Sequence, residues 1–576
     1  MNMEHIRHSF AHLLAAAVQR LYPKAKLGIG PVIEHGFYYD FGNVTLTEQD
    51  LSRIEKEMRS IASQRLPFKK ELWLKQKAKT YFQKLKQPFK LELIKDLKEQ
   101  KVGMVSTGDI FLDLCRGGHV KNTSELPLDA FKLTKVAGAY WKGDEKRPQL
   151  TRIYGVAFGT KEEMAEHLAM LEEAKKRDHR KLGKELKLFA LIDEVGPGLP
   201  LFYPKGAIVR RLIEDFITEQ QEKRGYLPIW IPHITKGDLY KISGHLDKYD
   251  AMFPAMELKG EADYYLKPMN CPHFMMLYKT EPHSYRELPL RWTATTTNYR
   301  YEKSGELSGI TRLRALTQDD CHVFARPDQI EQEINLMLDM VNEVYGVFGF
   351  KDFWVRISTR DPKHKDKYIG NPAVWKTSEA ILTSLVEKRG WKHDIGVGEA
   401  AFYGPKLDFI FKDVLSREWQ LSTIQLDMNL PQRFDLAYID EQGKKQQPVI
   451  IHRAILGSVE RFLGILIEHY AGAFPLWLAP EQVWVLPISE KFNDFAQGIA
   501  SQLKDIRTIV RTENESLGKK IREGELQKIP YLLVVGEKEQ QQGTISVRRR
   551  GQRDVKEMKL ETFLNTVTEE IKMKSS

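Results

Sequence analysis

Over the first 160 residues, the apolar positions change between helical and strand periodicity. A helical spacing over 5–21 is followed by a strand-like run at 36–41 and by a Lys-rich helical stretch at 51–86. This mixture predicts a self-contained α+β domain over residues 1–160. Residues 161–188 then form a charged amphipathic pattern, which predicts a linker helix.

Residues 189–479 combine amphipathic helices with strand-like runs. These runs cover 263–269, 290–302, 317–325, 406–414 and 418–426. Successive strands joined by loops favour an antiparallel sheet over a doubly wound one. From residue 480 to residue 576 the pattern becomes strand, helix, strand, helix, strand, over 483–487, 492–503, 508–511, 517–528 and 531–535. The chain is therefore predicted to be an α+β multidomain protein with an α/β C-terminal domain.

Charge and cysteine content narrow the classes of protein. Lys and Arg number 88 against 78 Asp and Glu, giving a net charge of +10 that suits a polyanionic partner such as nucleic acid. A solvated basic surface would give the same balance. Three cysteines in 576 residues argue against a disulfide framework and favour a reducing compartment, so the cytoplasm is expected. No segment has about 18 uninterrupted apolar residues, so no membrane span is predicted.

The most informative segment covers residues 290–325, two strand-like runs joined by a loop. Alternation on the first strand places Arg300 and Glu302 on one face. On the return strand the same alternation groups Gln318, Asp320 and His322. A cation, two carboxylates, an amide and an imidazole on one surface favour a functional site over a solvated sheet face. By the same parity Cys321 points away from His322 and is expected to be a packed thiol.

This segment resembles a known family, because NYRYEKSGELSGITRLRALTQDDCHVF (298–324) is similar to motif 2 of class II aminoacyl-tRNA synthetases, and of the threonyl-tRNA synthetase family in particular. Four further stretches agree: LKPMNCPH (266–273), AFYGPKLDF (401–409), WQLSTIQLD (419–427) and VIIHRAILGSVERFLGILIEHY (449–470). The last resembles motif 3, a strand running into a helix that ends with Glu460 and Arg461. RGYLPIWIPHI (224–234) resembles motif 1, which forms the dimer interface in class II enzymes.

The resemblance covers nearly the full chain. It implies a class II antiparallel catalytic core at 189–479, an N-terminal editing domain at 1–160 and a C-terminal anticodon-binding domain at 480–576. The implied activity is ATP-dependent activation of L-threonine and its transfer to the 3′ end of tRNA(Thr) by a homodimer. Because the chain begins at the editing domain, the small ubiquitin-like domain that often precedes it is expected to be missing.

The resemblance also implies one zinc ion, with ligands Cys271, His322 and His452. Taken alone, one cysteine and two distant histidines would more often be structural. A set of one thiolate and two imidazoles leaves the fourth coordination position of the zinc ion open, as catalytic zinc sites do. A zinc that accepts the amine and hydroxyl of threonine rejects valine, which offers no oxygen to the metal. Asp320 would accept a hydrogen bond from that hydroxyl, while Gln318 and Tyr403 hold the amine.

ATP, with Mg²⁺ bridging its phosphates, is assigned to the same site. By resemblance, Arg300 contacts the α-phosphate and the threonine carboxylate, and Arg461 contacts the terminal phosphate. Glu302 would read the adenine amino group. The other residues assigned to the site are Arg312, Lys406, Gln420 and Gln425. His245, in SGHL, matches a histidine implicated in transfer to the tRNA 3′ end.

A second, hydrolytic site is expected because serine also has a hydroxyl and lacks only a methyl group, a difference worth about 1–3 kcal/mol. HSFAH places His8 and His12 on one helical face, and DLCRGGH brings Cys115 and His119. With Lys90, these match the family's site for removing serine from mischarged tRNA. The same residue types could equally bind zinc. Since the threonyl family is thought to edit without a metal, the site is predicted to be unmetallated.

The family's anticodon contacts fall on Asn514, Arg522, Glu539 and Arg548. Side chains that bond to and stack on splayed bases explain how a small α/β domain reads an RNA loop. Two other functions compete with the ligase. A non-catalytic, synthetase-like RNA-binding protein should have lost active-site residues, yet every implied zinc and phosphate ligand is present. A free-standing aminoacyl-tRNA hydrolase would leave about 400 residues beyond the editing domain unexplained.

Leu316 stands where the family usually has an aromatic residue against adenine, opposite Arg461. One face of the stacking sandwich is thus aliphatic, which predicts weaker ATP binding. We expect Leu316→Phe to lower the apparent KM for ATP, measured by threonine-dependent ATP–pyrophosphate exchange. An unchanged KM would contradict this interpretation.

Overall fold

The structure is a computed structural model that describes residues 2–144 and 146–574. The chain divides into two compact units that meet between residues 172 and 173. The division falls inside helix α5 (Lys161–Arg177), within the segment predicted as a linker. The predicted single helix is in fact two, because Asp178 ends it and its side chain accepts the backbone N–H of Arg180 at the start of α6 (His179–Glu185). A carboxylate at an N-cap supports a new helix start at this position.

The first unit is built on an antiparallel sheet. Its strands are β1 (Lys26–Leu27), β2 (Val32–Ile33), β3 (Gly36–Gly42), β7 (Phe131–Tyr140) and β8 (Gln149–Ala157). They run in the order β1-β3-β8-β7, with β2 beside β3. Helices α1 (Met3–Leu21) and α2 (Leu51–Ala62) share one core with this sheet, in which Phe10 packs on Phe37 and Phe131. The predicted α+β class is confirmed.

A smaller sheet completes this unit and corrects one prediction. The stretch 51–86 is not continuously helical: α2 ends at Ala62, and β4 (Phe68–Leu74) precedes α3 (Lys75–Lys84). Strand β4 pairs along its whole length with β5 (Lys101–Thr107), which pairs in turn with β6 (Phe111–Leu114). Hydrogen bonds to β5, which is distant in the sequence, thus override the helical pattern. The local spacing of apolar residues does not show which strand a segment will pair with. Helix α4 (Pro88–Asp96) packs with α3 over a small core.

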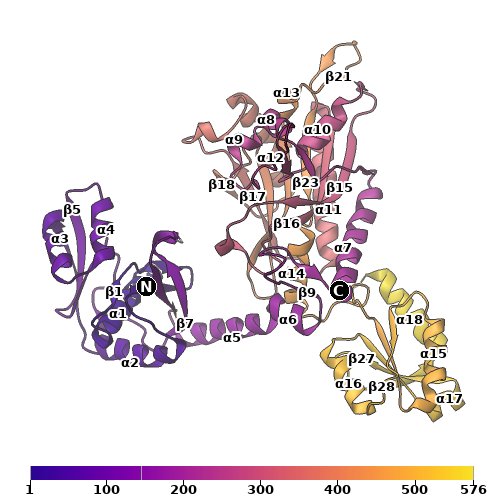
Figure 1. The fold of residues 1–576 in the computed structure, drawn as a ribbon, viewed down its shortest axis with the longest axis horizontal. Coiled ribbons are helices and arrows are strands. Elements are labelled where there is room, and N and C mark those ends of the chain that lie inside the picture. The colour runs from indigo at the N-terminus through magenta and orange to yellow at the C-terminus, as the bar shows by residue number, and fades with distance from the viewer. Residues whose placement is uncertain (1, 145, 575–576) are drawn as a thin grey trace. The chain divides into compact units, whose positions relative to one another are not determined.

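The second unit contains an eight-stranded sheet, seen at the centre of Figure 1. Its strands are β11 (Leu227–Pro228), β15 (Leu290–Tyr299), β16 (Ala315–Ala325), β17 (Phe353–Thr359), β18 (His393–Val397), β19 (Lys406–Lys412), β20 (Glu418–Asp427) and β23 (Val449–Ala454). Their order is β11-β15-β16-β23-β20-β19-β17-β18. All neighbours are antiparallel except the edge pairs β11–β15 and β17–β18. The predicted antiparallel core is confirmed.

Four long helices, together with Leu182 of α6, share the largest apolar core with one face of this sheet. They are α7 (Pro204–Glu222), α11 (Ile330–Val347), α12 (Pro372–Lys388) and α14 (Val459–His469). Strand β23 leads into α14, as the motif 3 resemblance implies. Glu460 and Arg461 lie in the first turn of α14, however, and not at its end as predicted, because Ser458 caps the helix there by accepting the N–H of Arg461. Helix α10 (Cys271–Lys279) packs in a separate cluster that includes Ala294 and Phe324 of the sheet.

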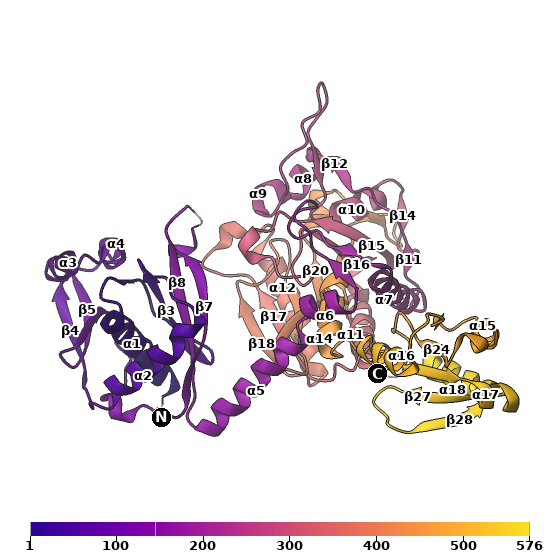
Figure 2. The same ribbon diagram turned by 60° about the horizontal axis from the view of Figure 1, so that its bottom comes forward.

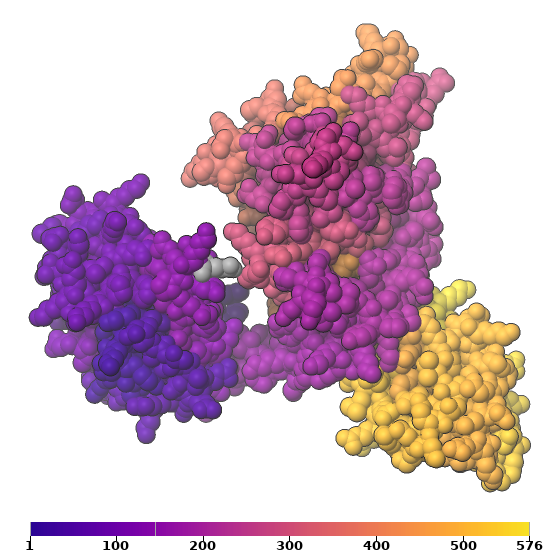
Figure 3. All heavy atoms as spheres, viewed as in Figure 1, coloured from indigo at the N-terminus to yellow at the C-terminus, as the bar shows by residue number. Residues whose placement is uncertain are grey.

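The C-terminal sheet has the order β25-β24-β26-β27-β28. Its strands are β24 (Val483–Pro487), β25 (Thr508–Val510), β26 (Tyr531–Val535), β27 (Thr544–Arg549) and β28 (Val555–Lys559), and its helices are α15 (Asn493–Gln502), α16 (Leu517–Leu526), α17 (Glu537–Gln542) and α18 (Leu560–Met573). The predicted α/β alternation holds through β26, after which β27 and β28 join antiparallel (Figure 2). In Figure 3 these residues, in yellow, form a rounded body. Among the described residues, no helix combines the length and the apolar character that crossing a bilayer requires.

Candidate active site

The pairing of four strands brings the predicted site residues into one row. His322 on β16 lies opposite His452 on β23, and His452 lies opposite Gln425 on β20. Gln425 in turn lies opposite Lys406 on β19. Residues directly opposite in antiparallel strands face the same side of a sheet. The row therefore presents two imidazoles, an amide and an ammonium to one surface, while Cys321 packs in the core on the other face.

Cys271, at the start of α10, completes the predicted metal-ligand set. Its Sγ and one ring nitrogen from each of His322 and His452 all lie within 4.8 Å of one another, and all three residues are buried. Both ring nitrogens of His322 and Nδ1 of His452 lack a hydrogen-bond partner among the described residues. Buried, unpartnered imidazole nitrogens beside a thiol are the donors that zinc prefers, so this set fits the ion.

Asp427 orients His452. Its Oδ2 lies 3.0 Å from Nε2 of His452, which leaves Nδ1 turned toward the thiol. Burial opposes the charged imidazolium, but the neighbouring Cys271 and Asp427 raise the pKa of His452 to about 10. A carboxylate behind a ligand histidine is the usual outer support of a zinc site. Sequence reasoning missed Asp427, although it ends the family stretch at 419–427.

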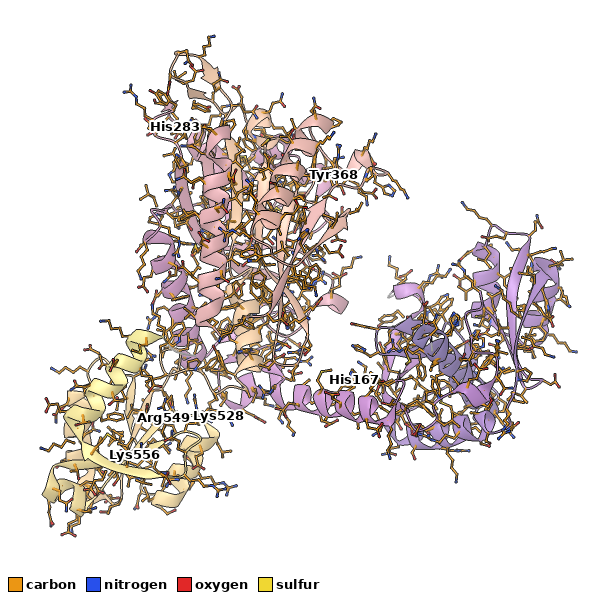
Figure 4. The ribbon with its side chains drawn as sticks, turned by 180° about the vertical axis from the view of Figure 1, so that it is seen from behind. His167, His283, Tyr368, Lys528, Arg549 and Lys556 are labelled. Atoms are coloured by element: carbon orange, nitrogen blue, oxygen red, sulfur yellow. The ribbon has the colours of Figure 1, made fainter. Side chains whose placement is uncertain are left out.

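A cavity of about 1130 Å³ opens beside the row. Its wall includes most residues predicted for ATP and threonine, namely Arg300, Glu302, Arg312, Gln318, Asp320, Tyr403, Lys406, Gln420, Gln425 and Arg461. Tyr368, labelled in Figure 4, belongs to the same wall. A large concavity with a few convergent charged groups is the expected form of a small-molecule site.

Asp320 is fixed by a chain of polar contacts. The Asn270 amide donates to its Oδ2 at 2.9 Å, and Lys267 donates to the Asn270 carbonyl at 2.9 Å. Burial raises the pKa of Asp320 and lowers that of Lys267 to about 8. Asn270 and Lys267 are a second group that sequence reasoning missed, although both lie in the stretch LKPMNCPH.

Two further wall residues are also held in place. Gln318 accepts a hydrogen bond from the Asn298 amide at 2.7 Å, and the Tyr403 hydroxyl donates to the Gln425 carbonyl at 2.5 Å. Burial raises the pKa of Tyr403 well above its usual range, so its hydroxyl remains protonated. The polar wall is therefore ordered before any ligand binds.

The predicted phosphate and adenine contacts lie along the rest of the wall. Glu302 accepts from Arg312 at 3.0 and 2.8 Å. Arg461 lies 5.6 Å from the Trp419 ring, burial lowers its pKa, and its Nε has no partner among the described residues. A half-buried guanidinium with a free donor beside an open cavity is suited to bind an anion.

His245 does not join the wall. It is fully buried, with Nδ1 2.7 Å from the Ser243 hydroxyl and Nε2 3.2 Å from the Met269 sulfur. Burial lowers its pKa to about 3. Met269 and Phe402, which both contact it, line the cavity. His245 therefore lies one side-chain layer behind the surface that its predicted role would use.

The predicted editing residues form a separate cluster in the first unit. One ligand-type atom from each of His8, His12, Cys115 and His119 lies within 4.8 Å of the others. The Cys115 Sγ is 3.4 Å from Nε2 of His8 and 3.2 Å from Nε2 of His119. Burial lowers the pKa of all three imidazoles, so they are neutral near pH 7. Lys90 is not in direct contact with them: it is buried in an ion pair with Asp113 at 2.7 Å.

The predicted anticodon contacts are spread over the C-terminal domain. Asn514 lies in the loop before α16, Arg522 on α16, Glu539 on α17 and Arg548 on β27. Asn514 and Arg522 are exposed. Glu539 is committed to structure, because it accepts the Gly536 N–H at 3.0 Å and the Ser546 hydroxyl at 2.8 Å.

Comparison with known proteins matches each part of this architecture. The class II tRNA synthetase core domain (G, H, P, S and T) matches residues 255–470, the anticodon binding domain matches 482–570, and the threonyl and alanyl tRNA synthetase second additional domain matches 102–154. An antiparallel sheet carrying these motifs, followed by such a domain, defines a class II aminoacyl-tRNA synthetase.

Individual relatives narrow the class. A threonine–tRNA ligase of Cytophaga hutchinsonii is 49% identical over 98% of this chain and 88% of its own, and one of Gloeobacter violaceus is 51% identical over 96% and 90%. A crystal structure of the RNA binding domain of threonyl-tRNA synthetase from Cryptosporidium parvum Iowa II superposes with a TM-score of 0.65 and 37% identity, covering 68% of this chain and 98% of that one. The chain belongs to the threonine–tRNA ligase family.

Proposed function

We propose that the protein activates L-threonine with ATP, transfers it to the 3′ end of tRNA(Thr), and hydrolyses Ser-tRNA(Thr). The single observation that carries the synthetic activity is the row of His322, His452, Gln425 and Lys406 beside Cys271 at one cavity wall. The proposal is supported by the 49% identity of this chain to a threonine–tRNA ligase over 98% of the chain's length.

Adenylate formation concentrates negative charge on the phosphates of ATP, which enters with Mg²⁺. Arg300 and Arg461 supply fixed cations, for the α-phosphate and the terminal phosphate respectively, and thereby stabilise that charge as it develops. Glu302 receives the adenine amino group, and its bond to Arg312 orients the carboxylate. Lys406, Gln420 and Gln425 complete the polar wall on β19 and β20.

Threonine is selected at the other end of the cavity. Cys271, His322 and His452 would hold a zinc ion, which when bound supplies a Lewis-acid site for the substrate amine and hydroxyl. The Asp320 carboxylate, fixed by Asn270, accepts the substrate hydroxyl hydrogen. Gln318 and Tyr403 orient the amine. Valine would leave Asp320 with the Asn270 amide as its only side-chain donor among the described residues and would displace water from the carboxylate without replacing its hydrogen bond, which is a larger penalty than the loss of one contact.

Transfer and editing use other parts of the chain. The proposed role of His245 in transfer requires a rearrangement of α9 (His245–Lys248) when tRNA binds, because the imidazole lies behind Met269 and Phe402. For hydrolysis of Ser-tRNA we propose the cluster of His8, His12, Cys115 and His119 acting without a metal. Neutral imidazoles can accept a proton from water, and contacts among the side chains already hold the cluster together. Lys90 would support it through Asp113.

The assembly is proposed to be a homodimer. Near motif 1, Leu227, Trp230 and Ile234 are 59%, 81% and 49% exposed, an apolar surface that a second copy would cover. Asn514, Arg522, Glu539 and Arg548 would contact the anticodon, on a domain whose surface also carries Lys528, Arg549 and Lys556 (Figure 4). A cytoplasmic location rests on the three free cysteines.

The proposed domain boundaries are 1–160, 161–188, 189–479 and 480–576. Their support is that each match to a domain family, at 102–154, 255–470 and 482–570, falls inside one proposed domain.

Amino-acid-dependent ATP–pyrophosphate exchange tests the synthetic function. We expect exchange with threonine, exchange with serine at about 10–200-fold lower kcat/KM, and none with valine. Chelation of zinc should abolish threonine-dependent exchange and added zinc should restore it. Absence of exchange by folded, zinc-loaded protein would instead support the non-catalytic RNA-binding alternative.

The zinc site is tested through Asp427. Removing the carboxylate in Asp427→Ala leaves His452 free to rotate, so zinc affinity measured by competition with a chelator should fall about 10–100-fold. Cys321→Ser is the matched control, because this buried thiol lies on the core face, and its zinc affinity should be unchanged. The intact protein should hold one zinc per chain. Two ions would contradict a metal-free editing cluster, and an unchanged affinity of Asp427→Ala would contradict the support role.

The editing assignment is tested with His12→Ala. Because His12 belongs to the cluster and its ring packs on those of His8 and His119, the variant should lose hydrolysis of Ser-tRNA(Thr) while threonine activation stays at the wild-type rate. His167→Ala is the control: His167 packs on His35 and Phe158 of the same unit, outside the cluster (Figure 4). Loss of both activities in His12→Ala would show a structural role for His12 in place of the proposed one.

A further inference from the structure

Asp408 is a buried carboxylate behind the cavity wall. It follows Lys406 by two residues on β19, so both side chains face the same side of the sheet. In the sheet it lies opposite Thr423 on one side and Arg356 on the other. The residue is 0% exposed and does not itself line the cavity.

Five donors from the three adjacent strands β17, β19 and β20 converge on this carboxylate. They are Nζ of Lys406 at 2.5 Å, Oγ of Ser358 at 2.7 Å, Nε2 of Gln420 at 2.8 Å, Oγ1 of Thr423 at 3.0 Å and Nη2 of Arg356 at 3.5 Å. Three of these, Lys406, Gln420 and Thr423, line the cavity. The two oxygens of one carboxylate therefore organise a continuous part of the wall.

We propose that Asp408 is a positioning residue for the activation of the amino acid, acting through Lys406, Gln420 and Thr423. This inference rests on the proposed ligase function. Asp408 touches no substrate: its effect is to fix which atoms of these three side chains face the cavity.

The hydrogen-bond directions give each wall residue a defined polarity. Lys406 uses one of its donors on Asp408, which holds the ammonium at the wall and leaves its other donors for a ligand. Gln420 donates to Asp408 while its carbonyl accepts from Arg356 at 2.5 Å, so its amide orientation is set at both ends. The Thr423 hydroxyl donates its hydrogen to Asp408, so its oxygen remains as a hydrogen-bond acceptor on the cavity side.

Only an ionised carboxylate satisfies all these donors. An asparagine at this position would replace one acceptor by an NH₂ group, which would face either Lys406, Arg356 and Ser358 or the two donors Gln420 and Thr423. Buried polar networks lose most of their value when one member is unsatisfied. The effect should fall on catalysis, because displacement of a reacting or charge-stabilising group by a fraction of its bond length is costly in rate.

The first test compares Asp408→Asn with the wild-type full-length protein in threonine-dependent exchange. We expect a fall in kcat of about 10–100-fold, with zinc still bound at one per chain. Hydrolysis of Ser-tRNA, assigned to the first unit, should be unchanged. The matched control is Glu333→Gln, since Glu333 is 1% exposed and paired with Arg291 but has no partner at the cavity, so its exchange rate should be that of the wild type.

The second test asks whether Asp408 acts through its neighbour. If it does, Asp408→Asn adds little to the defect of Lys406→Met, and the double variant is about as slow as Lys406→Met alone. If the fold losses in kcat of the two single variants multiply in the double variant, Asp408 does not act through Lys406. A wild-type kcat in Asp408→Asn would overturn the positioning role.

If Asp408→Asn loses its zinc, Asp408→Glu is tested in its place. This variant keeps the charge, should retain zinc, and should be slower than wild type but faster than Lys406→Met. A wild-type rate there would overturn the proposal. Failure of the wild type itself to exchange would overturn the ligase function and not the role of Asp408 in particular.

Discussion

The register of the antiparallel sheet is the constraint on which the site depends. One residue of slip between β16 and β23 would reverse the facing of one strand relative to the other, so that His322 and His452 would point to opposite faces of the sheet. The opposite face helps to fix this register. Arg453 is buried in an ion pair with Asp319 at 3.3 Å, and Asp319 also accepts two backbone N–H groups from the segment after β23.

Buried charge in the second unit is arranged in pairs. Asp408 meets Lys406, Asp427 meets His452, and Asp319 meets Arg453. Burying a lone charge is costly, and pairing it with hydrogen-bonded partners offsets that cost. Two of these pairs lie directly behind groups at the cavity wall. The same contacts that make burial tolerable thus also fix the orientation of the His452 imidazole and of the Lys406 ammonium, so stability and preorganisation have one origin.

The two units place the same residue types in different electrostatic surroundings. In the first unit, burial lowers the pKa of His8, His12 and His119, which favours neutral rings suited to proton transfer. In the second unit, burial likewise lowers the pKa of His322, whereas Cys271 and Asp427 overcome burial and raise the pKa of His452 to about 10. Neighbouring charge, and not residue identity, therefore sets which charge state each buried imidazole prefers.

The sequence by itself determined the domain order, the antiparallel class of the core and the common face of Gln318, Asp320 and His322, because strand alternation is a local property. Family resemblance added the ligands that the fold brings together. Only the tertiary structure decided that 68–74 is a strand and that His245 lies behind the cavity wall. It also decided that Asp408 and Asp427 hold the wall residues Lys406 and His452 in place. Each of these depends on which strand or side chain lies next to which, and such long-range pairing leaves no trace in local periodicity.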